Sequence, residues 1–567
     1  MLSSVPTASA AQSASSSVIN PKKLNQLVWQ IFTKSYGLTL QADAASFLSD
    51  KIASYSMNES QTSEFLNYMA QNYSKISKDR SGMVSRHNIE VVFNQVYQAH
   101  DYKDSAKDIR KYITVLDAFN TPKFEYDVHG KVFKQIPIKK EALLDSAKDK
   151  IMFNLRRFNI VKQRLLKQLR SDSDSSKITL TSIKSIKGIN SPNQERYVFG
   201  LVTEMSEGSY HLEDPEEFIP LDFSTLVEYP IDFVTDGGLY FMKGICFGTR
   251  FAVKSVLPVN CEKREETLSM LTHPDISEAT NYAEPLHELK QMEAQAKNAR
   301  FVIISEVWLD QPQILERLKI LFDGFNAQGS LPELFILIGP FSSNPPKDGP
   351  RAWAHYQDLF DGFAEFIERI KNVRQCRFVF VPAGNDPGFV DSLLPRPAIP
   401  EPIFDAWKRA KFDFVATSNP CRIIYFSQEI VIFRHEITQK MRTKALNIEL
   451  NSITERNQQE QQHEDTTITS NPLQIADYKR ALKTCLNQST LSPFNLSNQP
   501  VLWDSDHSLS LYPIPDVLIT AERQNSFEFV YEDCKCGNPG SFPSAEGSFL
   551  LYNPAQKRFD LCELPKK

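Results

Sequence analysis

Polar side chains follow several apolar runs in the second half of the chain, at positions where a hydrolase could bind metal ions. Glu306 follows the run 301–304, Asn385 and Asp386 follow another, and His435 follows a later one. Carboxylate, amide and imidazole groups bind divalent ions, and two adjacent ions can activate water for attack on a phosphoester. These four residues are therefore the candidates for a metal site that hydrolyses phosphoesters.

The elements that must position these residues are predicted by the apolar runs 301–304, 334–338 and 377–381. Such runs, bounded by Gly and Pro, are typical of strands buried on both faces of a sheet. Helical periodicity over 313–322 and 353–370 separates them, and this alternation predicts a parallel sheet. Open α/β sheets place their sites in the loops past the carboxyl ends of the strands. We expect the candidate residues to lie at this edge.

The order of these loops resembles that of the calcineurin-like phosphoesterases, which carry an acidic residue, histidines and a Gly-Asn pair at the corresponding positions. The resemblance places Trp308 at a histidine position and Pro340 at the position of the bridging carboxylate. Neither side chain can bind a metal ion, and the segment 520–524 has no histidine. We therefore expect a structural remnant, without catalytic residues, metal or cofactor, in which Asn385 caps a turn and Asp386 begins one. An active dimetal phosphoesterase is the alternative.

The rest of the chain divides by composition and periodicity into several segments. We expect a fold of the multidomain α+β class, with a small all-α domain, an OB-type β-barrel and an inactive calcineurin-like α/β sandwich. The expected ranges are a disordered tail over 1–19, the all-α domain over 20–100, an irregular linker over 101–139, a connecting helix over 140–174, the barrel over 175–262, and the sandwich over 280–567 with a disordered insertion at about 451–472.

The barrel is predicted from five short strands with alternating polarity. They are expected over 178–180, 197–202, 208–212, 218–223 and 251–253. Acidic residues between 204 and 217 would repel phosphate, so a barrel that docks a protein is favoured over one that binds single-stranded DNA. The basic face of the preceding helix, at 156, 157, 162, 164, 167 and 170, could contact phosphate. A solvated or acid-paired face is the favoured interpretation.

Bulk composition excludes some classes of function. The 567-residue chain is too long for one core. Its net charge of −5 gives no global attraction to nucleic acid or anionic membrane. No apolar run approaches the length of a membrane span. The eight cysteines are scattered apart from Cys534 and Cys536, which are a weak zinc signal, so a reducing compartment is expected.

Several strings along the chain together resemble the B subunits of eukaryotic replicative DNA polymerases, and among these the B subunits of the epsilon type. They combine an OB-type barrel with an inactivated calcineurin-like domain, and the small helical N-terminal domain is a further mark of the epsilon type. The strings lie at 119–126, 212–215, 304–310, 335–343, 418–423 and 538–542.

The resemblance implies a nuclear, non-catalytic subunit of the leading-strand polymerase. Its barrel and sandwich would bind the zinc-binding C-terminal domain of the catalytic subunit. Its N-terminal domain would dock on the GINS part of the CMG helicase and so tether the polymerase at the replication fork and during initiation. Histone-fold subunits would form part of the same complex, contact with DNA would be weak or indirect, and no membrane would be involved.

Overall fold

A computed structural model gives the structure of the chain. It describes residues 21–54, parts of 62–93, 109–138, 146–171, 178–188, 194–269 except 229 and 231, 280–446 except 281, 283, 347–348, 371 and 389–391, and 472–565 except 545–546. The chain forms two compact units, residues 1–109 and 110–567. In the described residues, no helix is long and apolar enough to cross a membrane.

In its described residues, the N-terminal unit is a small helical body with one short pair of strands. Helix α1 (Pro21–Trp29) continues into a π-helical turn, and α2 (Ala42–Ser54) follows. Both helices contribute to a core that includes Val28, Phe32 and Leu48. Strands β1 (Thr39–Leu40) and β2 (Met83–Val84) pair in parallel. The prediction of a purely helical domain was therefore wrong at these residues, because two residues of pairing leave no periodic signal in the sequence.

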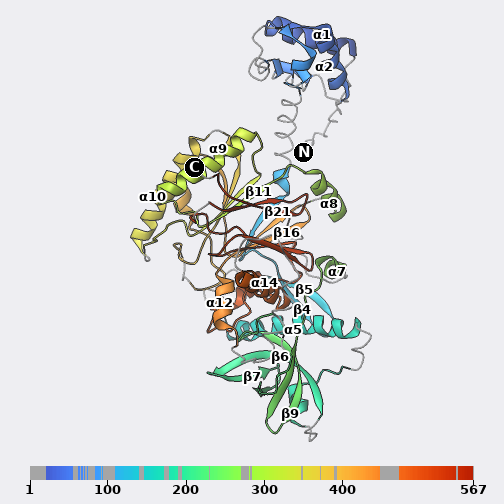
Figure 1. Ribbon diagram of the computed structural model, residues 1–567, viewed down its shortest axis with the longest axis vertical. Helices are drawn as coiled ribbons and strands as arrows, with labels where there is room; N and C mark the ends of the chain where they lie inside the picture. The colour runs from blue at the N-terminus through green and yellow to red at the C-terminus, as the bar shows by residue number, and fades with distance from the viewer. Residues whose placement is uncertain are drawn as a thin grey trace, which may run out of the picture. The chain divides into compact units, whose positions relative to one another are not determined.

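The second unit contains two six-stranded sheets (Figure 1). The first has the order β14-β13-β12-β11-β20-β21, and the second has the order β18-β19-β17-β16-β15-β3. The strands of the first sheet are β11 (Phe301–Ser305), β12 (Leu334–Ile338), β13 (Arg377–Val381), β14 (Asp413–Ala416), β20 (Phe549–Asn553) and β21 (Arg558–Cys562). Those of the second are β3 (Ile113–Asp117), β15 (Cys421–Tyr425), β16 (Gln428–Arg434), β17 (Val517–Ala521), β18 (Phe527–Tyr531) and β19 (Cys534–Asn538).

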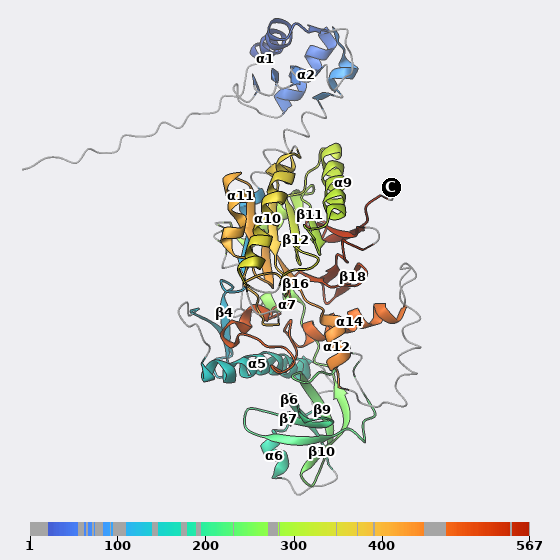
Figure 2. The same ribbon diagram turned by 90° about the vertical axis from the view of Figure 1, so that its left-hand side faces the viewer.

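Strands β11 to β14 are parallel, as the alternation of strand and helix predicts. Every residue of β11 and β12 is buried. Helices α9 (Pro312–Gln328) and α10 (Pro350–Glu368) cover the outer face of this sheet (Figures 1 and 2). Their apolar faces share one core with β12 and β13, in which Phe322 meets Phe335 with ring centroids 5.0 Å apart. The carboxyl ends of β11, β12 and β13 consequently lie side by side.

The segment 101–139 was expected to be irregular, and the structure corrects this expectation. Strand β3 forms the edge of the second sheet and pairs antiparallel with β15, from Ile113 opposite Tyr425 to Asp117 opposite Cys421. Strands β4 (Lys123–Asp127) and β5 (Val132–Ile136) form a hairpin. The breakers Pro122 and Gly130 lie between these short strands, so they mark turns of a folded segment. The expected insertion at 451–472 lies outside the described residues except for Pro472, where α14 (Pro472–Asn487) begins.

The barrel is closed, in the order β10-β8-β7-β6-β9. Its strands are β6 (Glu195–Ser206), β7 (Ser209–Glu213), β8 (Phe218–Asp222), β9 (Leu239–Phe247) and β10 (Arg250–Leu257). Four of the expected strands are present, but 178–180 contributes only the bridge from Leu180 to Tyr197, and β9 was missed. Most of β9 is buried without alternation, because it lies between β6 and β10 and also faces helix α5 (Ala147–Ser171).

The barrel is joined to the sandwich by direct hydrogen bonds. The backbone of Leu239 donates to and accepts from the Gln488 side chain, at 2.7 and 2.8 Å. Asn495 N donates to the Asp236 carbonyl at 2.8 Å. Helices α5, α14 and α12 (Ile437–Lys444) lie between the barrel and the two sheets in both views (Figures 1 and 2). The barrel is thus a fixed part of the second unit.

Smaller helices complete the second unit. They are α6 (Ile183–Lys187), α7 (Arg264–Leu268), α8 (Leu286–Gln295) and α11 (Asp405–Arg409), with 3-10 segments at Arg110–Tyr112, Val373–Gln375, Glu401–Phe404 and Trp503–Leu509.

Candidate functional site

Glu306 stands at the carboxyl end of β11, in the position expected for a metal ligand. Its side chain is 3% exposed, and its φ of 62° lies in the left-handed region. This backbone conformation costs a residue other than Gly about 1–3 kcal/mol. The contacts of Glu306 must therefore stabilise it. Its carboxylate accepts hydrogen bonds from the Arg523 guanidinium and the Ser541 hydroxyl, and Arg434 Nη2 lies 3.4 Å from Glu306 Oε1.

Arg434, the last residue of β16, ties the strand-end loops together. Its Nε donates to the Gly339 carbonyl at 3.3 Å, and its Nη1 donates to the Ala521 carbonyl at 2.7 Å and to Glu436 at 2.6 Å. The guanidinium is buried, and it neutralises Glu306 where a metal-dependent hydrolase would need cations. Both carboxylate oxygens of Glu306 therefore already accept hydrogen bonds from protein donors.

Trp308 and Pro340 offer no ligand atoms to this region. Trp308 packs against the core of the first sheet, and its indole N–H is buried without an acceptor among the described residues. Pro340 is buried two residues after β12 ends. The absence of the bridging carboxylate and of one imidazole stays a prediction from the sequence.

Asp386 is buried and serves as the polar centre of two loops. Its Oδ1 accepts from Phe341 N at 2.9 Å and from the Tyr356 hydroxyl at 2.8 Å, and its Oδ2 accepts from Ala383 N at 2.7 Å. A Cβ on Gly339 would lie 2.0 Å from Asp386 Oδ2, so only glycine fits there. Asp386 thus joins the loops after β12 and β13, a stronger structural role than the turn start expected from the sequence. Its neighbour Asn385 is exposed.

His435 lies beside a different set of residues. Its ring centroid is 5.3 Å from that of Phe433. Burial and the nearby charges of Lys440 and Arg434 lower the pKa of His435 to about 3, so the imidazole is neutral at pH 7. His435 contacts Phe433 of the second sheet. Glu306 and Asp386 accept hydrogen bonds from other residues. Glu306, the adjacent pair Asn385 and Asp386, and His435 therefore lie in three different environments.

Metal chemistry at other positions has little support. Among the residues that the structure describes, no group of three or more His, Cys, Asp or Glu side chains is placed to hold a metal ion. Cys534 and Cys536 lie inside the second-sheet core, and burial raises the pKa of the Cys534 thiol. A protonated thiol is a poor metal ligand.

Glu522 follows β17 and provides a prediction for pH dependence. Burial raises its pKa to about 8, although Thr438 donates to it from N at 3.0 Å and from Oγ1 at 3.1 Å. The folded state therefore binds a proton that the unfolded state loses near pH 4.3. The stabilisation from this proton is complete below about pH 4 and is lost as the pH rises to about 8, with a slope of up to about 1.4 kcal/mol per pH unit.

Glu522→Gln should therefore flatten the pH profile of unfolding. Urea denaturation of both proteins at several pH values between 5 and 8 gives the difference, which isolates this group from other titrating residues. Parallel profiles for the two proteins would contradict the raised pKa.

Sequence reasoning identified Glu306 and Asp386 but missed the two arginines that occupy the site. The signal was present in part, because Arg523 lies within the segment 520–524 that lacks histidine. Arg434 directly precedes the candidate His435 at the end of an apolar run, where a buried charge requires a partner.

The fold and this site define a class: an OB-type barrel fixed to a two-sheet α/β unit whose strand-end carboxylates are bound by arginine and backbone groups. Comparison with known proteins finds a matching family for the α/β region and another for the barrel. Residues 301–528 match the family of the B subunits of DNA polymerase alpha/epsilon, and residues 147–258 match the OB-fold domain of DNA polymerase epsilon subunit 2-like proteins.

Curated relatives extend this match over nearly the whole chain. DNA polymerase epsilon subunit 2 of Bos taurus is 30% identical over 558 residues, which cover 95% of this chain and 98% of the relative. The Mus musculus protein is 29% identical, covering 96% and 99%, and the DNA polymerase epsilon B subunit of Schizosaccharomyces pombe is 29% identical, covering 92% of each chain. The chain belongs to the family of DNA polymerase epsilon B subunits. A solved archaeal phosphodiesterase matches 47% of this chain and 99% of its own, with a TM-score of 0.22 and 11% identity.

Proposed function

We propose that this chain is the non-catalytic B subunit of a nuclear DNA polymerase epsilon. Its barrel and sandwich bind the zinc-binding C-terminal domain of the catalytic subunit, and its N-terminal unit binds the GINS part of the replicative helicase. The observation that carries the non-catalytic part is the binding of Glu306 by Arg434, Arg523 and Ser541. A carboxylate that is bound by two guanidinium groups and a hydroxyl is a poor ligand for metal ions, because its charge is already neutralised and the cations beside it repel a metal ion. The strand-end site is therefore a degenerate phosphoesterase site.

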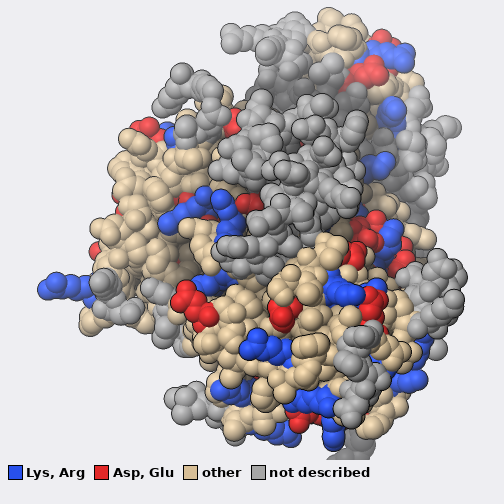
Figure 3. Space-filling view, turned by 60° about the horizontal axis from the view of Figure 1, so that its bottom comes forward, with Lys and Arg blue, Asp and Glu red and all other residues tan. Residues whose placement is uncertain are grey.

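A protein-docking role for the barrel is supported by its charges. Lysines on its surface pair with carboxylates: Lys187 with Glu217 at 2.5 Å, and Lys243 and Lys254 with Glu195 at 2.7 and 2.9 Å. Figure 3 shows Lys and Arg side chains interspersed with Asp and Glu over the described part of this end of the molecule. Mixed charge gives a weak field for a phosphate backbone. Phe218 and Phe247 are meanwhile exposed on the barrel, as at protein interfaces.

The non-enzymatic proposal predicts that the purified chain binds no stoichiometric divalent metal and does not hydrolyse a generic phosphodiester. Metal analysis after incubation with Mn²⁺, together with a bis(p-nitrophenyl) phosphate assay, measures both. Two ions per chain, with a turnover that is lost in Asp386→Ala, would establish the enzymatic alternative instead.

The tethering proposal predicts separable losses, because the chain divides after Ile109 into two compact units. Deleting residues 1–109 should leave association with the catalytic subunit intact and abolish association with the helicase. Co-purification of the polymerase subunits and a GINS pull-down measure the two. The isolated 1–109 fragment should compete with the full chain for GINS. Loss of polymerase assembly in the deletion would contradict this division of roles.

A further inference from the structure

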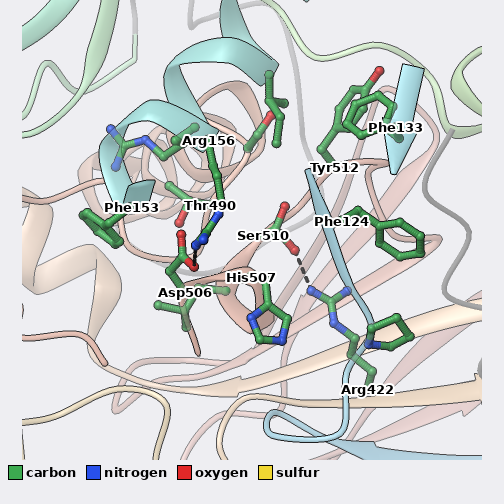
Figure 4. Close-up of a pocket in the computed structure, with 15 residues that line it drawn as sticks. Phe124, Phe133, Phe153, Arg156, Arg422, Thr490, Asp506, His507, Ser510 and Tyr512 are labelled. Atoms are coloured by element: carbon green, nitrogen blue, oxygen red, sulfur yellow. Dashed lines mark hydrogen bonds and ion pairs between the residues drawn. The ribbon is translucent and has the colours of Figure 1, made fainter. Parts of the chain in front are cut away.

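A cavity of about 60 Å³ lies where α5, the β4–β5 hairpin and the 3-10 segment Trp503–Leu509 meet. One side carries Arg156 and Asp506, and the other carries the rings of Phe133 and Tyr512, with Arg422 below them, where it donates to the Ser510 carbonyl (Figure 4). About 10–15 Å³ holds one water. The space therefore suits about four or five heavy atoms, the size of a phosphate ion.

Positive charge exceeds negative charge in the lining of this cavity. Three guanidinium groups, those of Arg156, Arg157 and Arg422, line it together with one carboxylate, Asp506. Arg156 Nη1 pairs with Asp506 at 2.8 Å, and so neutralises it. Arg422 pairs with Glu429, a residue outside the lining. Glu429 is in turn shared with a second arginine at 2.7 Å.

Arg157 is the charge without an acidic partner. It is 8% exposed, and its guanidinium donates to the Gly237 carbonyl. No carboxylate of the described residues lies within ion-pair distance of it. Burial lowers the pKa of Arg157 to about 10, so the group stays cationic at pH 7. The charge of Asp506 acts on Arg157 from beyond ion-pair distance and offsets the effect of burial only in part. A buried cation without an ion pair is costly, and an anion in the adjoining cavity would offset that cost.

The guanidinium groups at the cavity are not fully bonded. The Nε atoms of Arg156, Arg157 and Arg422 have no acceptor among the described residues, but each is inaccessible to solvent, so an anion would reach them only after the guanidinium groups turn. Hydroxyl groups of Ser489 and Thr490 are also in the lining. Guanidinium groups bind tetrahedral oxyanions through paired N–H donors. The aromatic wall keeps the local dielectric low and strengthens such contacts.

We propose that this cavity binds a phosphate-sized oxyanion, with Arg157 as its principal counter-charge. The site lies on the basic face of α5, away from the strand-end site. The bound anion links α5 to the hairpin and to the C-terminal loops, so it stabilises the second unit. The ligand is either free phosphate or the phosphate group of an ester that enters through the mouth of the cavity.

The test compares thermal unfolding of the full chain in phosphate with unfolding in chloride at equal ionic strength and pH. Phosphate at ten times its Kd should raise Tm by about 2 °C, and isothermal titration should show one site. Arg157→Met should abolish both effects. In phosphate-free buffer this variant should also match or exceed the wild type in Tm, because it removes the unpaired charge.

Arg170→Gln is the matched control, because Arg170 is an exposed arginine on the same helix, and its phosphate response should equal that of the wild type. Competition by O-phosphoserine would identify a phosphate ester as the ligand, and binding of inorganic phosphate alone would identify the free ion. A wild-type chain that responds equally to phosphate and chloride would overturn the proposal. An unchanged phosphate response in Arg157→Met would also overturn it.

Discussion

Replacing Arg434 by Met should lower the free energy of unfolding by about 3 kcal/mol, because the change breaks a buried ion pair from one side. Glu306 would keep Arg523 and Ser541 but lose the buried cation beside it. The carbonyls of Gly339 and Ala521 would lose their donors at the same time. Chemical denaturation of the full chain measures the loss.

Arg523→Met provides the matched control for that change. The Arg523 side chain is 55% exposed, whereas that of Arg434 is 7% exposed. Solvent screening limits an exposed pair to about 1 kcal/mol or less. Adding Glu306→Gln to Arg434→Met should recover part of the loss, because it removes a buried carboxylate that has lost its buried cation. Equal small effects of both arginine variants would show that Arg434 does not hold the strand-end loops.

Replacing Gly237 by Ala should destabilise the contact between barrel and sandwich by about 4 kcal/mol. Its φ is 93°, and an added Cβ would lie 2.2 Å from Asn495 N and 2.4 Å from the carbonyl carbon of Phe494. These are backbone atoms, and Asn495 N is already bonded to the Asp236 carbonyl, so they cannot move aside cheaply. Left-handed strain and overpacking act together here.

Gly248→Ala separates these two effects. Gly248 has a φ of 60° and no atom within 4 Å of the added Cβ, so it reports the backbone cost alone, about 1 kcal/mol. Denaturation of both variants gives the difference, and limited proteolysis reports whether the barrel is released. Equal losses in the two variants would mean that the contact at Gly237 adjusts freely.

The sequence was informative where local pattern and burial agree. The runs at 301–304, 334–338 and 377–381 were predicted as strands buried on both faces, and all three lie inside the first sheet. The hairpin of β15 and β16 was equally clear, because its two apolar runs are separated by two residues. In these cases each strand's own residues specify its environment.

Features that depend on distant partners were not predicted. Strand β3 was missed because its partner β15 lies about 300 residues later in the chain. The role of Asp386 was underestimated, because its donors lie in other segments: Phe341 in the loop after β12 and Tyr356 in helix α10. The pairing of Glu306 with Arg434 and Arg523 likewise joins three separate segments. Local patterns contain no information about such contacts.

Strand β3 has a mechanical consequence under the proposed tethering function. It begins four residues after the N-terminal unit ends at Ile109. Tension between a moving helicase and the polymerase would therefore reach this strand directly after the side-chain contacts of Arg110 and Tyr112. Its five residues pair with β15 at the sheet edge. Force directed along the strand loads those hydrogen bonds together in shear, and the rate at which they rupture sets the lifetime of the connection. β3 is thus the point at which the tether is anchored against force.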